Sequence, residues 1–240
     1  MLFRSPGKYP TPESIDAQFK RIGGDHVAWH REYLLEFIDE GGRLISPDWI
    51  KYYDQQPPDT ELIEIIITID LAVSKHDTAD YTAMIAAHVY DVEGKRLIYI
   101  LPNPVNSRLS PREALETAQH LANVMTGKRK PRLIVEDVGY QCSLIETLND
   151  NGYRAEGFKV RNQDKRARLA LGTHLIQSGQ VLFPRQGCEE LITQILDFGI
   201  ESHDDLADAM AMLLLSARMK SMGSYYGGVI DCGGSNSDDD

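Results

Sequence analysis

The chain has 240 residues, 42% of them hydrophobic, which is enough for one large α/β domain with its own core and an appendage. Its formal net charge of −11 argues against a protein that coats nucleic acid through its overall field, so a nucleic-acid role would need a local basic surface and divalent cations. Three widely spaced cysteines, and the lack of an apolar run typical of a signal peptide or a membrane span, favour a soluble protein in a reduced, intracellular compartment.

Three regions differ in character along the chain. Residues 1–58 begin Pro/Gly-rich and then carry apolar residues at helical spacing, too few for an independent core, so we interpret them as an N-terminal arm or linker. Residues 59–222 are expected to form the main domain. Residues 223–240 are low in apolar content and end in acidic residues, which indicates a flexible acidic tail.

The main domain begins with an apolar β-branched run at residues 62–73. Both of its faces are too apolar for a surface strand, so we expect it in the centre of a covered sheet. Strands at 82–91 and 96–101 follow, joined by a Glu93-Gly94 turn. After them we expect helices at 110–125, 141–149, 163–177 and 189–198, strands at 133–138 and 155–160, a short extended piece at 181–184, and a last helix from about 202. This order predicts a ribonuclease-H-like α/β fold, a mixed sheet with three antiparallel first strands and helices on both faces.

Acidic side chains occur at two of the expected strand ends and at the start of the last helix. Asp70 ends the first strand, Glu136 ends the strand that begins at 133, and Asp204, Asp205 and Asp208 open the helix. Converging carboxylates repel one another, so at pH 7 they need protons or cations, and their oxygens suit Mg²⁺ or Mn²⁺. Two such ions can hold a phosphodiester, activate the attacking water and stabilise the leaving oxygen, which predicts metal-dependent phosphodiester hydrolysis.

Simpler interpretations exist for several of these residues. Asp70 alone could be a turn acid, and Asp204 or Asp205 could be the N-cap of the last helix. Glu136 is harder to explain, because a glutamate that closes a buried aliphatic strand is costly without a partner. His203 could order a water or simply face solvent. Asp80 could support the site or belong to a turn.

Basic residues are grouped between positions 159 and 168. A solvated helix face is the simplest interpretation, yet five cations in ten residues of an acidic protein also suit a track for DNA phosphates. The predicted DNA-binding residues are Lys159, Arg161, Lys165, Arg166 and Arg168.

Four segments together resemble the nuclease domain of the large terminase subunit of tailed bacteriophages, over about residues 60–220. They are DLAVSKHDTADYTA, LIVEDVGYQ, VRNQDKRARL and SHDDLADAM. The segment WHREYLLEFIDEGGRLISPDWI also looks like the connection between ATPase and nuclease in such proteins. The chain has no GxxxxGK[ST] P-loop, so we expect no ATPase in it.

The resemblance implies a ribonuclease-H-like endonuclease that uses two Mg²⁺ or Mn²⁺ ions to cut concatemeric double-stranded viral DNA during genome packaging. It implies as partners the terminase ATPase domain, the small terminase subunit and the capsid portal, in the cytoplasm of the infected bacterial host. Asp70 would bridge both ions, Glu136 would hold one, and Asp205 and Asp208, ranked ahead of Asp204, would hold the other.

Two other hypotheses stay open from the sequence. A Holliday-junction resolvase or a ribonuclease H would share the acidic centre. A non-catalytic module that docks on a capsid portal or motor would need no metal.

Overall fold

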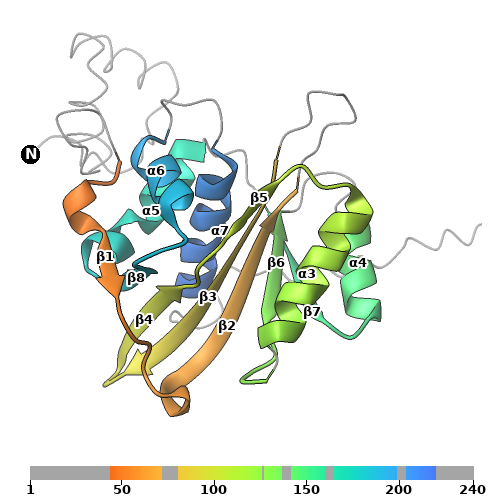
Figure 1. Ribbon diagram of the computed structural model, residues 1–240, viewed down its shortest axis with the longest axis horizontal. Coiled ribbons are helices and arrows are strands. Elements are labelled where there is room, and N and C mark those ends of the chain that lie inside the picture. Colours follow the sequence, from red (N-terminus) through yellow and green to blue (C-terminus); the bar gives the residue numbers. More distant parts are fainter. Residues whose placement is uncertain are drawn as a thin grey trace, which may run out of the picture.

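The computed structural model of the protein describes residues 44–71, 81–125, 127–136, 142–159, 165–198 and 204–219. Within them a mixed sheet of eight strands forms the centre, in the order β1-β8-β4-β3-β2-β6-β7, with β5 beside β3 (Figure 1). The strands are β1 Lys51–Tyr53, β2 Leu62–Asp70, β3 Thr82–Val92, β4 Lys95–Ile100, β5 Val105–Ser107, β6 Arg132–Glu136, β7 Arg154–Phe158 and β8 Val181–Pro184.

Strands β2, β3 and β4 form an antiparallel meander, as the sequence predicts. β3 and β4 meet at a tight turn in which Glu93 and Gly94 both have positive φ, and the side chain of Asp91 accepts a hydrogen bond from the Gly94 N–H at 2.9 Å. β6 then lies parallel to β2, and β7 parallel to β6. The predicted mixed sheet is therefore confirmed, and β2 is an inner strand of it, between β3 and β6.

Helices cover both faces of the sheet (Figure 1). α3 Pro111–Met125 and α4 Cys142–Asp150 pack on one face. α5 Lys165–Gln177, α6 Glu189–Leu196 and α7 Asp205–Met219 pack on the other. α3 starts with the capping signal seen in the sequence, because Glu113 accepts a hydrogen bond from the Ser110 N–H at 2.8 Å and its own N–H donates to the Ser110 hydroxyl.

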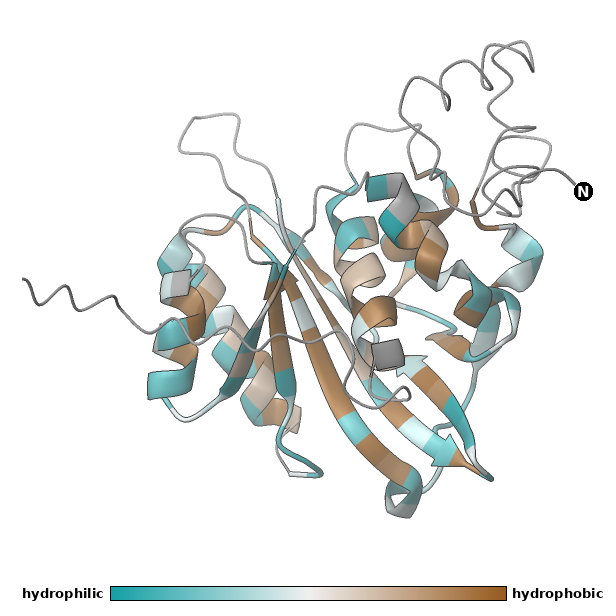
Figure 2. Ribbon diagram, turned by 180° about the vertical axis from the view of Figure 1, so that it is seen from behind, coloured by the Kyte–Doolittle hydropathy of each residue, from teal (hydrophilic) through white to brown (hydrophobic). Residues whose placement is uncertain are grey.

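The isoleucines of β2 explain why both faces need cover. Ile66 points into the core beneath α5, α6 and α7, whereas Ile67 and Ile69 pack against the side that carries α3 and α4. All three are fully buried, and each contributes about 1.5–3 kcal/mol of burial free energy. Hydrophobic segments accordingly run along the central strands, with hydrophilic residues between them (Figure 2).

Residues 44–58, which we placed in the N-terminal arm, join the sheet and its core. Leu44, Ile45 and Ile50 are buried with the α5–α7 side, and β1 pairs in parallel with β8. The extended piece at 181–184 is thus an inner strand between β1 and β4, while the expected first strand ends at Asp70 rather than 73. The rest of the expected arm and the acidic tail lie outside the described residues. None of the described helices has the length and apolar character of a membrane span.

Candidate active site

Two neighbouring parallel strands deliver the first two carboxylates. β2 and β6 run in the same direction, with Ile69 opposite Val135, so that Asp70 and Glu136 follow at the same edge of the sheet. Their side chains are hydrogen-bonded to each other. The strand-end geometry expected from the sequence thus brings these two acids into contact.

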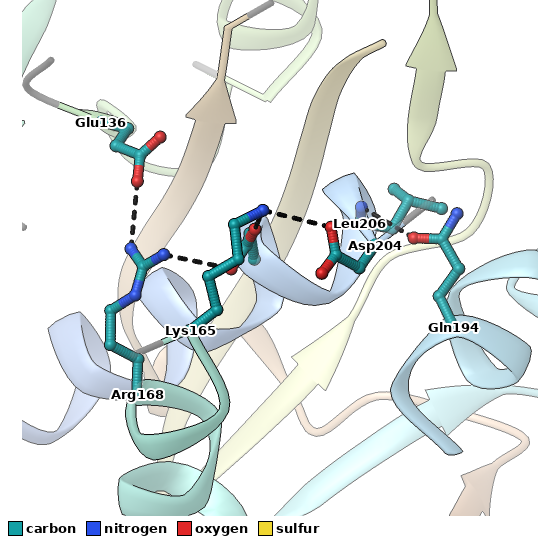
Figure 3. Close-up of polar contacts among 7 residues, drawn as sticks. Glu136, Lys165, Arg168, Gln194, Asp204 and Leu206 are labelled. Atoms are coloured by element: carbon teal, nitrogen blue, oxygen red, sulfur yellow. Dashed lines mark hydrogen bonds and ion pairs between the residues drawn. The ribbon is translucent and has the colours of Figure 1, made fainter. Parts of the chain in front are cut away.

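Helix α7 places its first turn against the same edge. The hydroxyl of Thr68, two residues before Asp70, donates a hydrogen bond to the Ala209 carbonyl at 3.0 Å and so fastens α7 to β2. On the other side, the Gln194 side chain of α6 accepts a hydrogen bond from the Leu206 N–H at 2.9 Å, as Figure 3 shows. These two contacts hold the start of α7, and with it Asp208, over the end of β2.

The roles of Thr68 and Gln194 were missed in the sequence. Thr68 is the one polar residue between Ile65 and Ile69, and a hydroxyl in such a run needs a buried acceptor, so a readable signal existed. Nothing in the pattern of α6 singles out Gln194.

Two cations from α5 reach into the acids. Arg168 donates to Glu136 Oε1 at 3.0 Å and to Asp208 Oδ1 at 3.2 Å, which joins β6 to α7 (Figure 3). Lys165 Nζ lies 2.5 Å from Asp208 Oδ2 and 3.2 Å from Asp204 Oδ1. Asp208 is therefore held on both oxygens, and its side chain is 3% exposed.

The pKa values of Asp70, Asp208 and Lys165 are shifted by burial and by the neighbouring charges. Burial, and after it the charge and hydrogen bond of Glu136 and the charges of Asp208 and Asp205, raise the pKa of Asp70 to about 9. Burial also raises the pKa of Asp208 to about 6, although Lys165 and Arg168 lower it. Although burial opposes it, the hydrogen bond and charge of Asp208 raise the pKa of Lys165. Burial and the neighbouring carboxylates therefore favour the protonated form of Asp70.

The five acids predicted from the sequence are thus brought together at one edge of the sheet. All of their donor atoms are carboxylate oxygens, which suit hard divalent cations such as Mg²⁺ and Mn²⁺. As the side chains stand, no group of three or more His, Cys, Asp or Glu residues in the described ranges surrounds a common ion position. The reason lies in the ion pairs above, because oxygens of Asp208, Glu136 and Asp204 point at Lys165 or Arg168.

The predicted DNA-binding residues fall in different places. Lys159 is exposed just beyond β7 at the acidic edge of the sheet. Lys165 and Arg168 contact the carboxylates, and Arg168 is buried, which a solvated helix face does not explain. Arg161, the Arg166 side chain, His203 and Asp80 lie outside the described residues.

Comparisons with known proteins agree with this geometry. A family model described as the Terminase RNaseH-like domain matches residues 67–217. The human cytomegalovirus terminase nuclease domain is similar at a TM-score of 0.52 and 12% identity, over 72% of this chain and 94% of that one. A manganese-soaked, inhibitor-bound structure of that domain has a TM-score of 0.51 and 14% identity, with the same coverage.

The magnesium-bound large terminase nuclease from thermophilic phage G20c is 13% identical, with a TM-score of 0.46, over 70% of this chain and 93% of that one. No curated protein sequence matched the chain. The family match spans residues 67–217, more than half of the sequence and nearly the whole sheet with its helices. The chain therefore belongs to the Terminase RNaseH-like domain family.

Proposed function

We propose that this domain is a divalent-metal-dependent endonuclease that cuts double-stranded, concatemeric viral DNA during genome packaging. The observation that carries the proposal is the convergence of carboxylates from β2, β6 and α7 at one sheet edge, in a chain with a terminase ribonuclease-H-like fold. Such a cluster is only partly compensated by Lys165 and Arg168 and costs folding free energy, so its presence points to a function.

The acids fit two Mg²⁺ or Mn²⁺ ions. Asp70, between the strand end and α7, would bridge them, Glu136 would hold one, and Asp205 and Asp208 would hold the other. When bound, the ions would neutralise the carboxylates and supply the Lewis acidity that phosphodiester hydrolysis needs. The manganese-soaked structure of the cytomegalovirus domain, similar in fold, supports this choice of ion.

Basic side chains at the same edge would orient the DNA. Lys159 is exposed there and can contact a backbone phosphate without moving. Lys165 is half exposed and reaches the acids from the first turn of α5, so its ammonium group lies where a scissile phosphate would arrive. Such contacts position a duplex without reading its sequence, which fits cleavage with little sequence preference.

The remaining parts of the proposal come from the family. The ATPase domain of a terminase, the small terminase subunit and the capsid portal would bring duplex DNA to this edge, in the cytoplasm of an infected bacterium. Their contacts with this chain belong to the same proposal.

The test is cleavage of supercoiled plasmid with Mn²⁺ or Mg²⁺, with and without EDTA. We expect nicked and linear DNA with the metal, and intact plasmid with EDTA or with Asp208→Asn. Asp59→Asn is the matched control, because Asp59 is an exposed acid just before the opposite end of β2 and pairs with Lys128. Intact plasmid under every divalent ion, or equal cleavage by Asp208→Asn, would refute the proposal. Faster cleavage of a branched DNA or an RNA–DNA hybrid would assign the site to a resolvase or a ribonuclease H instead.

A further inference from the structure

The described structure holds its acidic site together with cations from its own chain. Asp208 has one oxygen on Lys165 and the other on Arg168, and Arg168 also binds Glu136. The Arg168 side chain is 5% exposed, so this is a built arrangement in the interior and not a surface ion pair. It links α5 to both β6 and α7.

We propose that Lys165 and Arg168 are internal counter-ions that occupy the carboxylates in the absence of metal and must release them when divalent cations bind. The inference rests on the proposed function, because it concerns the same acids. It assigns to α5 a positioning role: the helix keeps the acids assembled and sets how strongly they bind metal.

The distances indicate that metal and side-chain cations compete for Asp208. Mg²⁺ binds carboxylate oxygen at about 2.0–2.1 Å. Lys165 Nζ already lies 2.5 Å from Asp208 Oδ2, and an Arg168 nitrogen lies 3.2 Å from Asp208 Oδ1. A divalent ion on Asp208 would therefore lie within a few ångströms of two positive groups in a buried place, where like charges repel strongly. Metal and side-chain cations therefore compete for the same two oxygens.

Both side chains can also move away from the carboxylates. Lys165 stands in the first turn of α5 with its side chain 53% exposed, so a change of rotamer takes its ammonium group into water. Arg168 is buried, but its Nε finds no hydrogen-bond acceptor among the described residues. A buried N–H without a partner is costly, which indicates that the observed position of Arg168 is not the best one available to it in every state of the site.

The experiment measures Mn²⁺ binding to the full chain without DNA, by the electron paramagnetic resonance signal of free Mn²⁺, together with the Mn²⁺-induced rise in Tm. The variants are Lys165→Gln and Arg168→Gln. Lys159→Gln is the matched control, because it removes one positive charge from the same edge at a residue that is exposed. None of these readouts depends on cleavage.

We expect Lys165→Gln and Arg168→Gln to bind Mn²⁺ at least about tenfold more tightly than the unaltered chain, because a competing buried cation is gone. Lys159→Gln should change the affinity by less than about twofold. The Mn²⁺-induced rise in Tm should be larger in Arg168→Gln, whose metal-free form leaves Glu136 without this cation and Asp208 with Lys165 alone. If Arg168→Gln folds only with Mn²⁺, that result supports the inference, and Lys165→Gln, altered at a half-exposed residue, still provides the affinity measurement.

Affinity that is unchanged or weaker in both variants would overturn the inference, since the cations would then not compete with metal. Absence of Mn²⁺ binding in every form would overturn it together with the proposed function. Tighter binding in the variants combined with intact plasmid would keep the counter-ion role and remove the nuclease.

Discussion

Gly172 lies where α5 packs tightly against α7. A Cβ atom at this position would lie 2.7 Å from Leu214 Cβ, 2.8 Å from its Cδ1 and 3.3 Å from its Cγ. Two of these distances are shorter than carbon atoms tolerate, and no rotamer change moves Leu214 Cβ, so in Gly172→Ala α5 has to move away from α7. Alanine gains about 1 kcal/mol of helix propensity over glycine, whereas overpacking costs about 1–3 kcal/mol. We therefore expect Gly172→Ala to lower the free energy of unfolding by about 1 kcal/mol.

The same displacement reaches the site, because Arg168 lies one turn before Gly172. Its contact with Asp208 is 3.2 Å, at the long end of the hydrogen-bond range, so a shift of about half an ångström in α5 breaks it. Urea unfolding with and without Mn²⁺ measures both effects, and the stabilisation by Mn²⁺ should be larger in Gly172→Ala than in the unaltered chain.

Two further variants test whether the contact with Leu214 causes the loss of stability. Leu214→Ala removes Cγ and Cδ1 but keeps Cβ, so the double variant should recover part of the loss, with a coupling of about 1 kcal/mol. Leu171→Ala, at an exposed neighbour, should shift stability by less than about 0.5 kcal/mol. A Gly172→Ala protein more stable than the original, with no coupling to Leu214, would show that the helices are not in tight contact.

Three other outcomes are expected. Arg132→Met should cost about 3–5 kcal/mol in urea unfolding because it removes the cation 2.7 Å from buried Glu64, whereas Arg185→Met, at an exposed ion pair, should cost under about 1 kcal/mol; equal losses would contradict this. Burial, and after it the charge of Lys128, lowers the pKa of His88 to about 4 from 6.5. The free energy of unfolding should therefore be at its full value above pH 6.5 and fall as the pH drops toward 4, by about 1 kcal/mol at pH 5. His88→Gln should lack this part of the shift in the urea midpoint. Excess Mn²⁺ should raise Tm and EDTA should reverse it, since a ligand at about 100 times its Kd adds about 2.7 kcal/mol; a Tm indifferent to Mn²⁺ would favour the assembly-module hypothesis.

The central meander could be read from the sequence because its signals are local. A run of isoleucines predicts a strand covered on both faces, and Glu93-Gly94 between two such runs predicts a hairpin. β1 carries no comparable signal: it has three residues, and its partner β8 is far along the chain, with Lys51 opposite Leu182. β5 is equally short and follows prolines. Such strands depend on tertiary pairing, which local patterns do not contain.

The acids of the site were predictable for a similar reason. Parallel neighbours end at the same edge of a sheet, so Asp70 and Glu136 had to meet once β2 and β6 were adjacent. The positions of Lys165 and Arg168 were not predictable, because helical periodicity gives the faces of α5 but not the element that each face contacts. Gly172 in the middle of that helix was the visible sign of a close helix partner, and only the fold identifies Leu214 as the contact.

Charge compensation connects the two interpretations of α5. The sequence suggested that Lys165 and Arg168 contact DNA, and the structure places both on carboxylates. Both interpretations follow if each cation needs an anion and the site offers a different one in each state. While Lys165 and Arg168 neutralise Asp208, the edge of this acidic protein attracts phosphate only weakly. If divalent ions took over the carboxylates, as we propose, the same two side chains would gain a phosphodiester as their nearest anion. On this proposal we expect metal binding to precede tight DNA binding, because the acids otherwise hold the groups that would contact the backbone.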